Sequence, residues 1–373
     1  MKGPKCFNSL LMTTDTVGGV WTYCMDLCRF LQPYGVHIHL VTMGGEMKDW
    51  QREEVAALNN VTVHETSYQL EWMQAPWADL EACGAHLLQL EAALQPDVVH
   101  LNCFAYGTLP FNAPVLVVAH SDVYSWFLAV KGEAPDAAWQ PYFHCVQKGL
   151  QSADLVIAPS RAMLDYAETI YGVSGNRQVI YNGRNRALFY KREKKRFVFS
   201  MGRVWDEAKN IQLLLSAAPH IHAPIKIAGD NTFEQSHIAL AQNGIEYLGK
   251  LSTGKVAAIL SEAAVYVLPA KYEPFGLSAV EAGLSGCALV LGNISSLREV
   301  WGDAALYVDT DDENTLAATV NHLLEDEALL KDYSNRAKER AQQYAAETMA
   351  QQYMMVYKQL LQKEKQTILT ELV

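Results

Sequence analysis

Short apolar runs alternate with amphipathic segments along the whole chain. Runs rich in Val, Ile and Leu predict buried strands. In the first half these are Phe7–Met12, His37–Thr42, Val61–His64, Val98–Asn102, Val115–Ala119, Leu155–Ala158 and Gln178–Ile180. The segments between them predict helices over Val20–Gln32, Trp50–Leu58, Ala78–Leu94, Pro141–Ser152 and Arg161–Tyr171, with Ser160 as the N-cap of the last and Gly172 just after its end. This alternation is typical of α/β domains with largely parallel sheets.

A second series of the same kind follows the charged stretch Lys191–Arg196, which we interpret as a solvated linker between two domains. Its predicted strands are Phe197–Met201, Ile225–Ala228, Ile245–Leu248, Ala264–Leu268 and Ala288–Leu291. Long helices with few breakers fill the region from about residue 325 to 366. We therefore predict one doubly wound domain over residues 1–192 and another over 193–350, followed by a C-terminal helix over 351–373. In such folds the ligand binds at the carboxyl ends of the strands.

Composition narrows the class of protein. The 373 residues carry a net charge of −11 and form no obviously basic face, which argues against nucleic acid as a partner. The seven cysteines include no Cys-x-x-Cys pair, so neither a zinc site nor a disulfide framework is expected. No apolar run reaches the length of a membrane span, and the start lacks the pattern of a secretory signal. We expect a cytoplasmic protein; a weak hydrophobic contact with a membrane surface stays open.

The most informative motif is a glycine-containing turn between two glutamates, Glu273 and Glu281. Glu273 is expected in a strand-to-helix loop, and Glu281 in the next helix. Phe275, Gly276 and Leu277 would present backbone N–H groups at the start of that helix, where anions bind well. Because carboxylates accept hydrogen bonds from hydroxyl groups, this arrangement suits a polyhydroxylated phosphate ester, and it predicts a nucleotide-sugar site.

Two cations follow the first strand of the second series. Arg203 comes directly after Gly202, and Lys209 lies six residues further on. An arginine and a lysine at a strand's carboxyl end are suited to holding a diphosphate and to neutralising its charge as it leaves. The alternative is a surface pair near a linker, and the Glu273–Glu281 motif favours the functional interpretation.

Weaker signals follow two strands of the first series. Gly18 and Gly19 come after the first strand and allow close approach of a phosphate or sugar, although tight turns explain most such pairs. His120 ends the strand over Val115–Ala119 and is expected to face the ligand, unless it is a structural histidine. Asp122 would orient His120, touch an acceptor, or cap the next segment of the chain. The acidic run Asp309–Asp312 is better explained by helix capping than by a metal, so no metal is assigned.

Several short stretches share an order and spacing with a known family. They are Ala153–Ser160, Val179–Gly183, Gly202-Arg203 with Lys209, Tyr247–Gly249, Glu273 with Glu281, Ala282–Val290 and Leu297–Glu299. Together they resemble the family-4 glycosyltransferases, which are retaining enzymes of the GT-B fold, with two Rossmann-like domains facing across a cleft. Two departures stand out: Ile227–Asp230 lacks the family's frequent second glycine, and Tyr181 replaces a proline before Asn-Gly.

The resemblance implies a role for each matching position. Arg203 and Lys209 would bind the donor diphosphate, together with backbone at Gly18–Gly19 and Phe275–Leu277. Glu273 would contact the hydroxyls of the donor sugar, Glu281 those of the ribose, and His120 would lie beside the transferred sugar. The nucleobase would lie near five residues, Gly229, Asp230, Gly249, Lys250 and Leu251. The C-terminal helix is expected to cross back to the first domain.

The implied reaction is transfer with retention from a nucleotide-diphosphate sugar to an acceptor hydroxyl, which forms an α-glycosidic bond. The proton of the acceptor would pass to the departing phosphate oxygen, so no dedicated base, cofactor or metal is expected. A UDP-sugar donor and a saccharide or small-molecule acceptor are favoured, with Trp72, Trp77, Trp126 and Trp139, all expected in loops, available to stack on sugars. The alternatives are a sugar-nucleotide epimerase of the same fold and a non-catalytic sugar-nucleotide binding subunit.

Overall fold

The computed structural model describes residues 7–230 and 244–371, with side chains described up to residue 362. The chain forms two compact units. The first contains the residues up to 125, 134–183 and those from 346 onward, and the second contains 126–133 and 184–345.

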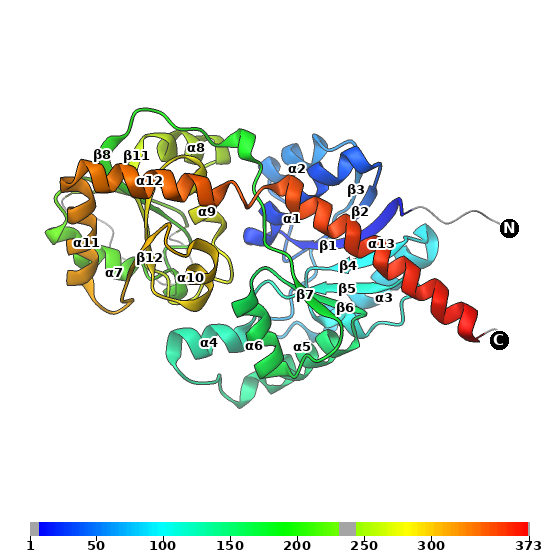
Figure 1. The fold of residues 1–373 in the computed structure, drawn as a ribbon. Helices are drawn as coiled ribbons and strands as arrows, with labels where there is room; N and C mark the ends of the chain where they lie inside the picture. Colours follow the sequence, from blue (N-terminus) through cyan, green and yellow to red (C-terminus); the bar gives the residue numbers. More distant parts are fainter. Residues whose placement is uncertain (1–6, 231–243, 372–373) are drawn as a thin grey trace. The chain divides into compact units, whose positions relative to one another are not determined.

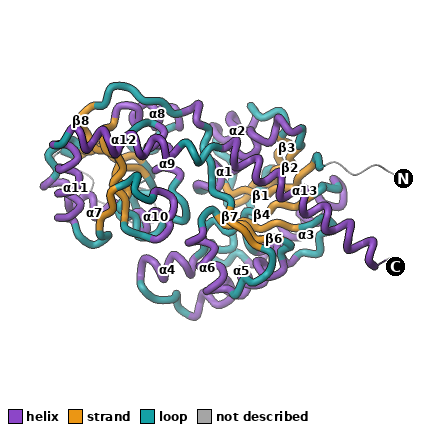
Figure 2. Tube along the Cα trace, viewed as in Figure 1, coloured by secondary structure: helices purple, strands orange, loops and turns teal. Residues whose placement is uncertain are grey.

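The first unit is built on a seven-stranded parallel sheet in the order β3-β2-β1-β4-β5-β6-β7. Its strands are β1 (Ser9–Asp15), β2 (His37–Met43), β3 (Val61–His64), β4 (Val98–Leu101), β5 (Val115–Val118), β6 (Leu155–Ala158) and β7 (Arg177–Val179). Its helices are α1 (Gly19–Leu31), α2 (Asp49–Ala56), α3 (Trp77–Leu94), α5 (Gln140–Ser152), α6 (Arg161–Tyr171) and α13 (Ala346–Glu371). Helix α4 (Val123–Lys131) contains residues of both units. Figures 1 and 2 show the sheet enclosed by helices on both faces.

The core of this unit explains why its strands are apolar throughout. Along β1, Leu10 and Met12 belong to the cluster that α1 and α13 cover, whereas Leu11 belongs to the cluster on the opposite face. All three are fully buried. Because both faces of the sheet are covered, polar and apolar residues do not alternate along such a strand. Figure 1 shows α13 running across the face that α1 also covers, so the last helix completes the first unit.

The second unit has a six-stranded parallel sheet in the order β10-β9-β8-β11-β12-β13. Its strands are β8 (Lys195–Met201), β9 (Ile225–Ala228), β10 (Ile245–Tyr247), β11 (Ala263–Leu268), β12 (Ala288–Gly292) and β13 (Leu306–Val308). Its helices are α7 (Ile211–Ala217), α8 (Thr253–Glu262), α9 (Leu277–Leu284), α10 (Ser295–Trp301), α11 (Glu313–Glu325) and α12 (Glu327–Ala341). In both sheets the strand order reverses beside the first strand, at β1/β4 and at β8/β11, which is where doubly wound folds bind ligands.

The structure confirms the predicted α/β fold and corrects two local interpretations. The region from Asp122 to Trp139, expected as a loop, contains helix α4 and a 3₁₀ turn over Ala137–Trp139. Asp122 starts the helix, because its carboxylate accepts hydrogen bonds from the backbone N–H of Ser125 at 2.9 Å and from the Ser125 hydroxyl at 2.5 Å.

The stretch Lys191–Arg196, expected as a solvated linker, lies within the second unit. Apart from the segment 126–133, the chain passes between the units at residues 183–184 and 345–346, and strand β8 already begins at Lys195. The Lys194 ammonium donates to the carbonyls of Leu260 and Ser285, at 2.9 and 2.8 Å. One residue of this charged run, Lys194, therefore anchors the start of β8, because its ammonium satisfies carbonyls at two helix ends.

Helix α6 has both of its predicted caps. Ser160 Oγ accepts from the Met163 N–H at 3.1 Å, and Gly172 ends the helix at φ +68°, with its N–H directed to the carbonyls of Ala167 and Glu168. A left-handed conformation at this position favours glycine, which has no Cβ to strain.

We expect Ser160→Ala to lower the free energy of unfolding by about 1 kcal/mol, because the Met163 N–H loses its acceptor. Urea denaturation followed by circular dichroism measures the change. Ser174→Ala, at an exposed position past the same helix, serves as the matched control and should change stability little. Equal effects of the two substitutions would contradict the capping role.

Candidate functional site

In the second unit, the predicted site residues follow the carboxyl ends of neighbouring strands. Arg203 and Lys209 follow β8, Gly229 and Asp230 follow β9, and Glu273 follows β11. Gly249 and Lys250 come shortly after β10. The sheet order β10-β9-β8-β11 therefore collects these residues at one edge, beside the reversal between β8 and β11.

Lys209 and Glu273 form the central ion pair of this edge. The Lys209 ammonium lies 2.5 Å from Glu273 Oε2, and their side chains are 19% and 12% exposed. Two backbone hydrogen bonds draw their loops together, since Lys271 N and Tyr272 N both donate to the Ala208 carbonyl, at 2.9 and 3.4 Å. A cation held in this way has little conformational entropy left to lose when an anion binds.

Arg203 is held by a residue that the sequence analysis did not single out. Its Nη2 lies 2.7 Å from Asp206 Oδ2, and its guanidinium lies over the Trp205 ring, 5.3 Å from the centroid. Asp206 also caps the 3₁₀ turn over Glu207–Lys209 by accepting from Ala208 N. Burial opposes ionisation of Asp206, but the charges of Arg203 and Lys209 outweigh it, so its pKa lies below the ordinary value.

The backbones of β8 and β9 approach each other closely at two glycines. Gly229 adopts φ +147°, and a Cβ at this position would lie 1.7 Å from the Gly202 carbonyl oxygen. Its N–H donates to the Gly249 carbonyl at 2.9 Å, and its carbonyl accepts from the Tyr247 hydroxyl at 2.6 Å. Asp230 beside it pairs with Lys250 at 2.5 Å. Only glycine fits here, so the region expected to hold a nucleobase has a fixed backbone.

Helix α9 begins as predicted at the glycine-containing turn. Gly276 is its N-cap at φ +92°, and Leu277 is its first residue. The Phe275 ring is buried and packs edge-to-face on Tyr344, with centroids 5.3 Å apart. Leu251 is partly buried against the same core cluster. The side chain of Phe275 therefore serves packing, and only its backbone groups are candidates for ligand contacts, whereas Leu251 keeps part of its side chain exposed.

Glu281 lies in α9 and forms a buried ion pair that spacing does not reveal. Its Oε1 lies 2.7 Å from Arg184 Nε, and the two side chains are 11% and 4% exposed. Arg184 also lies over the Phe189 ring, 5.3 Å from its centroid. Arg184 follows the Asn182-Gly183 pair and is 97 positions from Glu281 in the sequence, so only the fold brings them together. The carboxylate that was expected to contact ribose is thus held from one side by a guanidinium.

In the first unit, Gly18 and Gly19 begin helix α1. Gly18 is the N-cap in an extended conformation, and Asp15 Oδ1 accepts from the N–H groups of Val17 and Gly18, each at 3.0 Å. A Cβ at Gly19 would meet no atom within 4 Å. Protein packing therefore does not require a glycine at position 19, and the space above it is open.

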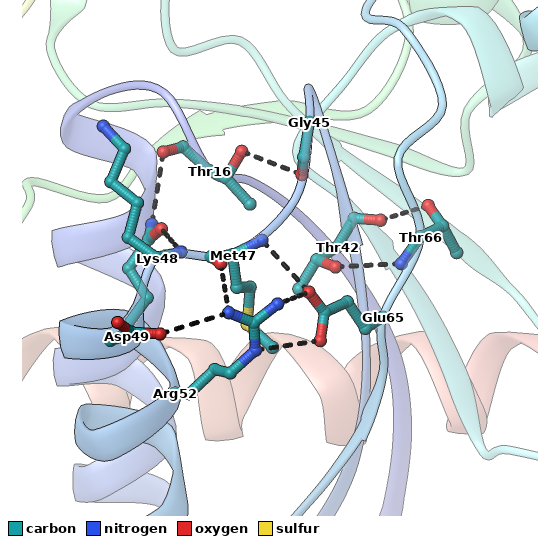
Figure 3. Close-up of polar contacts among 10 residues, drawn as sticks. Thr16, Thr42, Gly45, Met47, Lys48, Asp49, Arg52, Glu65 and Thr66 are labelled. Carbon is teal, nitrogen blue, oxygen red and sulfur yellow. Dashed lines mark hydrogen bonds and ion pairs between the residues drawn. The ribbon is translucent and has the colours of Figure 1, made fainter.

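A polar network fixes the loop after β2 beside this glycine turn (Figure 3). Thr16 Oγ1 donates to the Gly45 carbonyl at 3.2 Å, and Gln51 Nε2 donates to the Thr16 carbonyl at 3.2 Å. Arg52 donates to the Met47 carbonyl and pairs with Glu65 at 2.5 Å. The loops after β1, β2 and β3 are consequently tied together at the carboxyl edge of the first sheet.

His120 lies directly beyond β5 and is partly exposed. Its Nε2 lies 2.7 Å from Asn102 Oδ1, and the Tyr23 ring packs edge-to-face against it with centroids 4.7 Å apart. Burial lowers the pKa of His120 to about 3, so the imidazole is neutral at pH 7.

Asp122 does not orient His120. Its carboxylate accepts from Ser125 and from the Tyr171 hydroxyl, the latter at 2.6 Å, and the contacts within the described part of the chain do not include His120. Burial raises its pKa. The capping role considered for Asp122 is the one that the structure shows.

The fold defines two doubly wound α/β units, and the second collects cations and carboxylates at its ligand-binding edge. Two family models match the chain: "Glycosyltransferase Family 4" over residues 17–188, and "Glycosyl transferases group 1" over residues 183–340. Together they cover both units, and the chain belongs to the family-4 glycosyltransferases, whose fold is GT-B.

Named relatives and solved structures agree with this assignment. The chain is 31% identical to phosphatidyl-myo-inositol mannosyltransferase of Mycolicibacterium smegmatis over 45% of this chain and 46% of that protein. It is 21% identical to N-acetyl-α-D-glucosaminyl L-malate synthase of Bacillus anthracis, covering 94% of this chain and 96% of that protein. Sucrose-phosphate synthase from Thermosynechococcus elongatus superposes with a TM-score of 0.80 at 21% identity, covering 95% and 100% of the two chains. Anabaena HepE, solved with UDP and glucose, gives 0.76 at 17% identity, covering 94% and 100%.

Within the part of the chain that the structure describes, no helix is both long and apolar enough to cross a bilayer.

We expect Arg184→Met to destabilise the protein by about 3–5 kcal/mol, because it leaves the buried Glu281 carboxylate without its guanidinium partner. The double variant Arg184→Met, Glu281→Gln should recover much of this loss. Urea unfolding of both variants measures the difference. Arg186→Met, two residues away at an exposed position, is the control and should change stability by less than about 0.5 kcal/mol. A double variant no more stable than Arg184→Met would refute the pairing.

Proposed function

We propose that this protein is a retaining glycosyltransferase that moves a sugar from a nucleotide-diphosphate sugar to a hydroxyl of a saccharide or small molecule, forming an α-glycosidic bond. The pair of cations after β8 is the observation that carries the proposal. Arg203 and Lys209 are each held by a carboxylate, Asp206 and Glu273, at the edge where doubly wound sheets bind ligands. Fixed cations stabilise the negative charge that develops on a departing diphosphate.

The remaining roles follow from the chemistry of each group. Glu273 and Glu281 accept hydrogen bonds from hydroxyls of the donor sugar and of the ribose. The rigid backbone around Gly229 and Gly249 lies against the nucleobase. The start of α9 at Gly276–Leu277 and the glycine turn at Gly18–Gly19 offer backbone N–H groups to phosphate oxygens. His120 contacts the transferred sugar. Because Arg203 and Lys209 balance the diphosphate charge, the proposed reaction uses no metal or other cofactor.

A UDP-sugar is the proposed donor, and a saccharide or a small polar molecule is the proposed acceptor. The structurally similar HepE was solved with UDP-glucose, which supports a uridine donor. Two relatives carry names that describe small products, a glucosaminyl malate and a maltose phosphate, and these support a small polar acceptor.

The donor is tested by incubating the protein with UDP-, GDP- and ADP-sugars and measuring released nucleotide, with and without EDTA. We expect UDP release from one UDP-sugar at a rate that EDTA does not change. Proton NMR of the first-formed hydrolysis product should show the α-anomer, as retention requires. Release of GDP or ADP alone would show that the donor is not a UDP-sugar. A β-anomer would show that the reaction does not proceed with retention.

We expect Lys209→Ala to lower kcat by at least about 100-fold, because the leaving diphosphate loses the charge that stabilises it. Lys255→Ala removes an equal charge from an exposed position in α8 and should leave turnover near that of the wild type. Steady-state nucleotide release measures both variants. Near-normal turnover by Lys209→Ala would show that the proposed diphosphate site is wrong.

A further inference from the structure

The orientation of one side-chain amide in the first unit is fixed by its partners. Asn102 follows β4, beside the reversal between β1 and β4. The backbone N–H of Asn102 donates to Thr13 Oγ1 at 2.9 Å, and the side-chain Nδ2 donates to the Thr13 carbonyl at 2.7 Å. A carbonyl oxygen only accepts hydrogen bonds, so the amide nitrogen must face Thr13. The amide oxygen, Oδ1, therefore faces the other way.

Two histidines meet at this amide oxygen. His120 Nε2 lies 2.7 Å from Asn102 Oδ1, and His100 Nε2 lies 3.3 Å from the same atom. Because an amide oxygen only accepts, His120 Nε2 must carry the ring proton. His100 Nε2 also lies 3.4 Å from the Tyr23 hydroxyl, and it donates to both oxygens when it carries the proton. Burial lowers the pKa of both imidazoles to about 3, so each ring holds one proton at neutral pH and Nδ1 is left with a lone pair.

The helix α13 closes the network from the other side. The Tyr357 hydroxyl lies 2.7 Å from His100 Nδ1, and burial raises the pKa of this tyrosine well above its usual value. Tyr357 therefore keeps its proton and donates it to the lone pair of His100 Nδ1. The hydroxyl of Tyr357 then donates to His100, and His100 donates to Asn102. In this arrangement every donor in the chain of hydrogen bonds meets an acceptor.

His120 differs from His100 at its second nitrogen. Among residues 7–230 and 244–371, no group donates a hydrogen bond to His120 Nδ1, and the residue is partly exposed. We propose that Asn102 is a positioning residue that locks His120 as the Nε2–H tautomer, so that Nδ1 is a permanent acceptor for a hydroxyl of the substrate. This inference rests on the proposed function, because it assumes a substrate rich in hydroxyl groups.

The fixed tautomer of His120 determines which ligand groups can bind to Nδ1. A neutral imidazole in the opposite tautomer would present an N–H at Nδ1 and would favour acceptors such as carbonyl or phosphate oxygens. The tautomer fixed here rejects these groups and accepts a hydroxyl proton. The network also holds the ring in place without a charge, so recognition does not depend on the anionic part of the donor.

The tautomer can be measured without any substrate. In protein labelled with ¹⁵N-histidine, the ring signals of His120 are identified by their loss in His120→Gln. We expect a pure Nε2–H pattern in the wild type and a mixture of tautomers in Asn102→Ala, which removes the amide oxygen. Asn60→Ala is the matched control, since this buried amide of the same unit donates to the Cys28 and Val36 carbonyls and does not contact His120. An Nδ1–H pattern in the wild type, or an unchanged pattern in Asn102→Ala, would overturn the proposal.

Measurements of kcat/KM distinguish a positioning role of Asn102 from a purely structural one. Asn102→Asp keeps an acceptor oxygen toward His120 but loses the donor to the Thr13 carbonyl, so it should keep the tautomer while losing stability. We expect kcat/KM to fall about 10-fold or more in Asn102→Ala and distinctly less in Asn102→Asp. A purely structural role through Thr13 gives the reverse order, which would refute positioning. If Asn102→Asp does not fold, the ring signals of Asn102→Ala decide alone. If the wild type turns over no nucleotide sugar, the proposed function fails while the tautomer result stands.

Discussion

Strand order is the constraint on which both halves of this molecule depend. In a parallel sheet every strand ends at the same edge, and the reversal beside β1 or β8 makes the loops that follow neighbouring strands diverge. In the second unit this brings Lys209 and Glu273, 64 positions apart, to a distance of 2.5 Å. In the first unit it brings Asn102 beside Thr13 and His120. The polar groups are therefore placed by topology before any of their own interactions form.

In the second unit, three cationic side chains form ion pairs. Arg203, Lys209 and Arg184 each have a carboxylate partner, and the Arg184–Glu281 pair is nearly removed from solvent. A buried ion pair adds little net stability compared with apolar packing, because both charges lose hydration. Orientation is a separate effect: under the proposed function, Lys209 held by Glu273 would stabilise a leaving diphosphate without further reorganisation. A diphosphate binding at this edge must share Arg203 and Lys209 with Asp206 and Glu273.

Much of the fold was predictable because both sheets are buried on both faces. The strands over Leu155–Ala158 and Ile225–Ala228 have the predicted limits, and the caps of α6 lie at Ser160 and Gly172. Local patterns fail where the decisive partner is distant in sequence. No spacing rule connects Arg184 with Glu281, and Asp122, which caps α4, has its Tyr171 partner 49 positions away. Lys194 was expected in solvent because a charged run usually is, but its ammonium satisfies two carbonyls at helix ends.

The polar groups of the two units differ in charge. The second unit concentrates ionised groups, whereas the first places two neutral imidazoles, His100 and His120, around one amide oxygen. Neutrality is imposed by burial, which lowers the pKa of each ring to about 3. A charged imidazole has no lone pair to offer, so only the neutral ring can accept a proton from a hydroxyl. Tyr357 extends this requirement to α13, so the helix that completes the core of the first unit also fixes the protons within its polar network.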